Sequence, residues 1–207
     1  MAAEQKVPRR RLSAEDRSLE IVEAARALAL TDGLSAVTLR RVAGRLAVAP
    51  SLIAHYEPSM DDLVARTFAA VANDELAEVE ALIRTKESPT ARLRALIGSV
   101  CEETRDHVAA LWADAWSIGR SNALLAASAR RSMDSWQSCA TGIVRDGVEA
   151  GEFNTEDPDE VGFLLFSLVD SASAYGLVDY RPREEWHRLL RRSMARAVGV
   201  PIEALEP

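Results

Sequence analysis

Apolar side chains recur along most of the chain at the three- and four-residue spacing of amphipathic helices. Serine, threonine, asparagine or aspartate stands where most of these apolar runs begin, and glycine or proline follows where several end. No segment shows the sustained alternation of a half-buried strand. The pattern predicts an all-α protein of about nine helices.

Two of the predicted helices are very short and stand close together near the start of the chain. They cover about residues 39–46, after the cap residue Thr38, and about residues 50–56, with Pro50 in the first turn. Helices of this length are not stable alone, because too few backbone hydrogen bonds repay nucleation. Such a pair is typical of proteins that present the second helix to a narrow target, above all the major groove of DNA.

The predicted helices fall into three segments. We expect residues 1–12 to form a flexible basic arm, residues 13–58 a three-helix head with a helix-turn-helix, and residues 59–207 a larger helical body. The helices of the body are predicted over about residues 60–84, 89–105, 108–118, 123–150, 158–178 and 182–199.

Charge is distributed unevenly between these segments. The 207-residue chain has a formal net charge of −7, but residues 1–66 carry +1 and the remainder −8. This asymmetry is expected of a DNA-binding head on an acidic body. No apolar run approaches the roughly 20 residues that span a bilayer, and no apolar segment follows the basic start as in a secretory signal. We therefore expect a cytoplasmic protein without a membrane partner.

The residues that carry enzyme chemistry are scattered. The three histidines form no metal-binding motif, and neither a glycine-rich phosphate loop nor a nucleophile elbow is present. We expect no catalysis, no metal and no cofactor. Cys101 and Cys139 lack the spacing of a metal site or disulfide framework, so they are interpreted as small buried hydrophobes, with a thiol sensor as the alternative.

Three stretches together resemble the head of TetR-family transcriptional regulators. They are Asp32-Gly33-Leu34 at a helix end, residues 37–43 with the Thr-apolar-x-x-Val-Ala pattern, and residues 48–63 with a tyrosine near the end of the second short helix. The resemblance covers about residues 13–66. Residues 144–153 are also similar to the stretch that closes the long seventh helix in many members.

The resemblance implies a homodimer that binds a near-palindromic double-stranded DNA operator with one short helix per subunit. The residues at matching positions are Thr38, Arg40, Arg41, Pro50, Ser51, Ala54, His55 and Tyr56. Ser51 and His55 would reach base edges, and Pro50 and Ala54 thymine methyl groups. The others, with the arm, would hold phosphates, although the arginines also fit an interpretation as solvated surface residues.

Four residues depart from the family pattern. Ala47 stands at the usual turn glycine, Ala49 at the usual Ser or Thr cap, Glu57 at a usual Phe, and Met60 at a usual phosphate-contacting Lys. Loss of a cation and gain of an acid should weaken DNA binding. A helical protein-binding adaptor with a degenerate head is therefore the alternative to a regulator.

The body is predicted to dimerise through its last two helices. Small residues including Gly162 lie near one stripe of helix 158–178, and Leu189, Leu190, Met194 and Val198 give the last helix an apolar face. The candidate ligand-binding residues are Trp112, Trp116, Trp136, Phe166, Asp170 and Tyr175.

Aromatic walls with a few polar groups suit a small apolar or amphipathic effector. The same aromatics also fit an ordinary core, and Asp170 a hydrogen bond between helices. The function predicted from the resemblance is a ligand-responsive repressor, whose effector shifts the population toward a form that releases DNA.

Overall fold

The computed structural model describes residues 13–102 and 106–207, and the regular structure in these ranges is helical throughout. In chain order the elements are α1 (Ala14–Asp32), η1 (Leu34–Ala36), α2 (Leu39–Leu46), α3 (Pro50–Tyr56), α4 (Met60–Arg84), α5 (Pro89–Val100), α6 (Asp106–Gly119), α7 (Ala123–Glu149), α8 (Pro158–Gly176), α9 (Arg183–Val198) and η3 (Ile202–Leu205). None of these helices is both long and apolar enough to cross a bilayer. The all-α prediction is confirmed.

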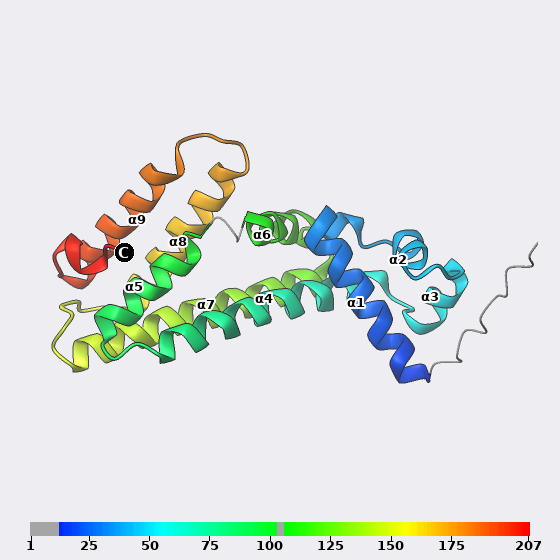
Figure 1. The fold of residues 1–207 in the computed structure, drawn as a ribbon, viewed down its shortest axis with the longest axis horizontal. Helices are drawn as coiled ribbons and strands as arrows, with labels where there is room; N and C mark the ends of the chain where they lie inside the picture. Colours follow the sequence, from blue (N-terminus) through cyan, green and yellow to red (C-terminus); the bar gives the residue numbers. More distant parts are fainter. Residues whose placement is uncertain (1–12, 103–105) are drawn as a thin grey trace, which may run out of the picture.

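The molecule is elongated, with the short helices at one end. Figure 1 shows α1, α2 and α3 gathered at that end, and α8 and α9 beside the C-terminus at the other. The long helices α4 and α7 pack against each other and run lengthwise between the two ends. This arrangement sets a small head on a larger helical body.

Capping side chains begin several helices at the predicted positions. The Ser13 hydroxyl accepts from the Asp16 N–H, and Asp16 reciprocates, which completes a capping box. The Thr38 and Ser59 hydroxyls each accept from one backbone N–H at the start of α2 and α4. Pro50 occupies the first turn of α3, where its missing N–H breaks no helical bond. These local signals fix the bounds of α2 and α3 as the sequence predicts them.

Two predicted helix ends were wrong by two to five residues. Helix α5 ends at Val100 rather than near residue 105, where the Cys101 N–H closes a tight turn on the Gly98 carbonyl at 3.1 Å. Helix α8 ends at Gly176 rather than near residue 178, and α9 ends at Val198. The predicted basic arm, residues 1–12, lies outside the described residues.

Two hydrophobic clusters fill the interior. The first joins α1, α2 and α3 to the first half of α4 and to parts of α6 and α7, with Ile21, Ile53, Leu63 and Leu125 fully buried. The second joins the end of α4 to α5, α7, α8 and α9. Burial of apolar surface drives this packing, so the head is held by body helices as well as by its own.

Candidate functional site

The outward face of α3 carries the four residues predicted to meet base pairs. Pro50, Ser51, Ala54 and His55 are all exposed, and their spacing places them on one side of the helix. Ile53, between them in sequence, is 0% exposed and anchors the opposite side in the head core. The arrangement presents a short, rigid helix with small and polar side chains outward, a shape suited to a DNA groove.

The predicted phosphate-binding residues differ in how exposed they are and in whether their side chains already have a partner within the chain. Arg40 is exposed and has no ion pair within the described ranges, whereas the Arg41 guanidinium donates to Asp32 at 2.6 Å. Thr38 is exposed but already accepts from the Arg41 N–H at 3.4 Å. Tyr56 is half-buried, with its ring 5.2 Å from that of His55. Arg40 is therefore the cation of this set best able to hold a phosphate.

The turn between α2 and α3 shows the effect of two departures from the family pattern. Ala47 has φ 52° and ψ 48°, the left-handed conformation that glycine adopts without steric cost. Ala49 makes no side-chain cap bond at the start of α3. The turn is formed although Ala47 replaces the glycine that favours its left-handed conformation and Ala49 replaces a capping Ser or Thr.

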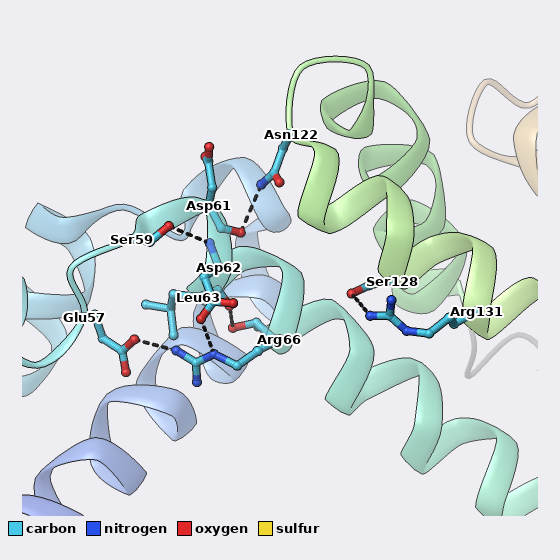
Figure 2. Close-up of polar contacts among 10 residues, drawn as sticks. Glu57, Ser59, Asp61, Asp62, Leu63, Arg66, Asn122, Ser128 and Arg131 are labelled. Atoms are coloured by element: carbon cyan, nitrogen blue, oxygen red, sulfur yellow. Dashed lines mark hydrogen bonds and ion pairs between the residues drawn. The ribbon is translucent and has the colours of Figure 1, made fainter.

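Glu57 lies inside the molecule rather than on the candidate DNA surface. Its side chain is 7% exposed and accepts from the Arg66 guanidinium at 2.5 Å, while Arg66 also donates to Asp62 at 2.7 Å (Figure 2). A paired carboxylate facing inward contributes little repulsion toward phosphate. This placement removes the direct electrostatic reason for expecting Glu57 to weaken DNA binding.

Two polar contacts connect α7 and α6 to the elements next to the short helices. The Asn122 side chain accepts from Leu125 N–H at the start of α7 and donates to the Asp61 carbonyl on α4 at 3.0 Å (Figure 2). The Asp114 carboxylate on α6 accepts from the Leu34 N–H, at the start of η1, at 2.7 Å. Both α6 and α7 are thus tied directly to the elements that carry the short helices.

A cavity of about 690 Å³ lies in the body and brings together five of the six predicted ligand residues. These five are Trp112, Trp116, Trp136, Phe166 and Asp170. Tyr175 is the exception, since it packs against the rings of Tyr180 and Trp186, at 5.2 and 4.9 Å between centroids, and these two residues line the cavity instead.

Sequence reasoning missed the cavity residues on α4 and α9. Glu75 on α4 and Trp186 on α9 line the cavity, as does Tyr180 just before α9. Trp186 is a large aromatic in the polar first half of α9, which was a usable signal. Glu75 carried no such signal, because it is one of several acidic residues on α4.

Trp112 connects the cavity to the head. Its ring meets Phe68 edge-on at 4.9 Å between centroids and lies 6.0 Å from Trp116. Phe68 belongs to the hydrophobic cluster of the head, and Trp112 packs against both that cluster and the cluster of the body. A ligand that moves Trp112 therefore acts on a side chain in contact with both interiors.

Asp170 is a charged residue of the cavity wall whose protonation is perturbed by burial. Desolvation raises the pKa of its carboxyl group from 3.8 to about 6. The two cavity-lining guanidiniums have other partners: Arg183 grips both Asp106 oxygens, at 2.7 and 2.6 Å, and Arg181 donates to Glu185 at 3.0 Å. Above pH 6 the Asp170 carboxylate stays charged in a largely apolar wall.

Both cysteines are half-buried thiols without a disulfide. Burial raises the pKa of Cys101 and of Cys139 to about 11. Because the thiolate is the reactive form, these values favour the interpretation as packing residues over a thiol sensor.

Several residues predicted to form a dimer surface are used within the chain instead. Gly162 packs against α7, where an added Cβ would lie 2.4 Å from the Thr141 hydroxyl oxygen. Leu190, Met194 and Val198 of α9 are buried in the body cluster. Of the residues predicted for the apolar face of α9, Leu189 remains exposed, at 46%.

Comparison with known proteins assigns the head to a family. Residues 21–67, which include α2 and α3, match the family model described as bacterial regulatory proteins, tetR family. No curated protein matches the sequence.

Solved structures resemble the chain over most of its length. One protein, from Saccharomonospora viridis in complex with choline, is 19% identical with a TM-score of 0.77 over 88% of this chain and 96% of its own. A TetR transcription regulator from Haloarcula marismortui is 16% identical, with a TM-score of 0.74 over 89% and 97%. The regulator FadR from Bacillus subtilis, in complex with stearoyl-CoA, is 17% identical, with a TM-score of 0.67 over 87% and 97%. The structural matches establish a shared all-α fold, and the family model assigns residues 21–67 to the tetR family of bacterial regulatory proteins.

Proposed function

We propose that this protein is a ligand-responsive transcriptional repressor that binds a near-palindromic operator as a homodimer. The observation that carries the proposal is the face of α3, where Pro50, Ser51, Ala54 and His55 are exposed on a helix anchored by Ile53. Small and polar side chains on a rigid exposed helix can reach base edges without steric conflict. No catalytic step is part of this function, and its place is the cytoplasm, where a bacterial regulator meets its operator.

The proposed dimer forms through α8 and the segment that follows it. Leu164 and Tyr175 on α8 are 37% and 42% exposed, Val178 just after α8 is 72% exposed, and Leu189 on α9 is also exposed. Exposed apolar side chains are typical of a protein interface when they gather on one surface. Val178→Glu should therefore raise the dissociation constant of the dimer in sedimentation equilibrium, with Arg94→Glu on α5 as the control.

The proposed effector binds in the cavity of the body. Its volume of about 690 Å³ is within the range of small-molecule sites. The Saccharomonospora viridis and Bacillus subtilis proteins were solved with choline and stearoyl-CoA, which supports a ligand in a body of this fold.

The proposed response passes through α6. An effector that displaces Trp112 presses on Phe68 of α4, and any movement of α6 also acts on the bond from Leu34 N–H to Asp114. Either motion would change the position of the head relative to the body. An effector that binds the DNA-free arrangement more tightly would then shift the population and release the operator.

Selection of bound sequences from a random DNA pool, at low and moderate salt, tests the proposal. An enriched near-palindrome is the expected outcome. Arg40→Ala should weaken binding to the selected site and flatten its salt dependence by about one unit of charge. Arg94→Ala, an exposed arginine on α5, is the matched control and should leave both unchanged.

His55→Ala should instead alter the selected sequence, since a base-reading side chain is lost. Absence of enrichment at either salt, with an intact dimer, would refute DNA recognition. The uncapped start of α3 and the absence of a lysine at Met60 would then favour the protein-binding adaptor. Repression itself is measured with a reporter placed behind the selected site.

A further inference from the structure

The cavity wall carries an acidic side chain at the centre of an apolar stripe. Phe163, Phe166, Asp170 and Ser173 line the cavity at three- and four-residue spacing on α8, and Leu177, the residue that caps this helix, lines it too. Asp170 therefore faces the same space as the aromatic rings before it. A carboxylate in such a place is costly unless a cation or hydrogen-bond donors compensate it.

The described chain supplies no such compensation. Asp170 makes no hydrogen bond and no ion pair with any residue in the described ranges. Arg183 Nη2 already donates to both carboxylate oxygens of Asp106, and Arg181 pairs with Glu185 beside the Tyr180 ring. The charge on Asp170 is left for a group that enters the cavity.

The cavity as a whole favours a positive guest over a negative one. Its wall includes two guanidiniums, on Arg181 and Arg183, and one histidine, His187. The carboxylates in the wall are those of Glu75, Glu102, Asp106, Asp170 and Asp179. Because the guanidiniums already have carboxylate partners, an anionic ligand would meet more repulsion than attraction.

All four tryptophans of the chain line this same cavity. They are Trp112, Trp116, Trp136 and Trp186, from α6, α7 and α9. Indole rings are the side chains that bind cations best through their π faces. Phe166 stands 5.5 Å from Trp136 between ring centroids and extends the aromatic wall toward Asp170.

We propose that the ligand of this cavity is a hydrophobic organic cation, an amine or quaternary ammonium, held between the indole rings with Asp170 as its counter-charge. This proposal rests on the proposed function, since it names the chemical class of the effector. The aromatic walls bind the apolar part of the ligand, and the carboxylate selects the sign of its charge.

Calorimetric titration at pH 8, without DNA, tests the assignment with three probes of equal chain length. The probes are hexyltrimethylammonium, 1-hexanol and hexanesulfonate. Hexyltrimethylammonium should bind about tenfold or more tightly than either other probe, a difference that cation–π contacts and one counter-charge supply. Quenching of tryptophan fluorescence in the same titrations would place the probe in this cavity, because every tryptophan lines it.

Asp170→Asn keeps the size of the side chain and removes its charge. The substitution should weaken the binding of hexyltrimethylammonium by about tenfold and leave the affinity for 1-hexanol unchanged. The unchanged affinity for 1-hexanol would also show that the cavity is intact. Asp134→Asn, an exposed aspartate on α7 outside the cavity wall, is the control and should change neither affinity.

Equal or tighter binding of the sulfonate or the alcohol would overturn the assignment, as would no cation binding up to millimolar concentration. Equal cation affinities of the parent and Asp170→Asn would also overturn it. Failure of the regulatory function is distinguished by adding the selected operator. If the cation binds through Asp170 but does not release DNA, the proposed ligand class is supported and the proposed effector response is refuted.

Discussion

Replacement of Gly147 by alanine should destabilise the protein, although alanine is the better helix former. The Phe153 ring folds back over the last turns of α7, and a Cβ at position 147 would lie 2.0 Å from Phe153 Cδ2 and 2.4 Å from Cε2. The N–H groups of Glu152 and Phe153 both donate to the Gly147 carbonyl, at 2.8 and 3.0 Å. The backbone after α7 therefore cannot move away from position 147 without losing these bonds. An added Cβ would instead displace the Phe153 ring.

Two opposing contributions determine the size of the effect. Alanine in place of glycine inside a helix gains about 1 kcal/mol. Displacing Phe153, which is 5% exposed, forfeits about 1.5–3 kcal/mol of burial, and overpacking costs a similar amount if the ring stays. The net loss is about 0.5–2 kcal/mol in the free energy of unfolding, which lowers Tm by roughly 1–8 °C for a protein of this size.

Urea unfolding followed by far-UV circular dichroism, at fixed protomer concentration, measures the difference. Gly142→Ala is the matched control, because Gly142 lies in the same helix and an added Cβ meets nothing within 4 Å. It should stabilise the protein by up to about 1 kcal/mol. On a Phe153→Ala background, the cost of Gly147→Ala should disappear. If both glycine replacements stabilise the protein to the same extent, the packing argument is refuted.

Three further predictions concern stability. Ala47→Gly should raise Tm by a few degrees, since the left-handed φ of 52° costs a residue with a side chain about 1 kcal/mol; a lower Tm would contradict the reasoning. Asp114→Ala removes the acceptor of the 2.7 Å bond from Leu34 N–H and should lower the free energy of unfolding in urea by about 1–3 kcal/mol, whereas no change would mean that this bond contributes nothing. The folded-state pKa of Asp170, about 6, exceeds its ordinary 3.8, so folding takes up a proton between these values and stability falls as pH rises through this window. Asp170→Asn should therefore be more stable than the parent at pH 8, with the difference shrinking as pH falls toward 4, and a pH-independent difference would argue against the shift.

The head was predicted closely because its signals are local. Thr38 and Pro50 mark the starts of α2 and α3 through their own backbone chemistry, and the bounds of both helices agree with the prediction. The end of α5 was missed, since nothing in the sequence after Val100 opposes a helix as strongly as glycine or proline does. Tertiary packing determines where such a helix ends, and it depends on contacts with residues that are distant in the sequence.

The cavity was predicted in part, for a different reason. Trp112 and Trp116 could be paired from their spacing on one helix, but the contribution of Trp186 depends on how α9 is rotated against α8. Gly162 illustrates the same limit: a small residue permits close approach, yet the sequence does not say of which helix. Its neighbour is α7 of the same chain rather than a second subunit.

The hydrophobic cluster shared by head and body has a consequence for protein engineering. Exchanging heads between regulators to redirect them to new operators requires a cut in the chain. A fragment that ends at residue 58 keeps Ile21 and Ile53 but lacks Leu63 and Phe68, which belong to the same cluster on α4, and lacks the contribution of α6 and α7. A chimera joined after Ala72, with matching residues grafted onto α6 and α7, preserves the interior that keeps α3 in place.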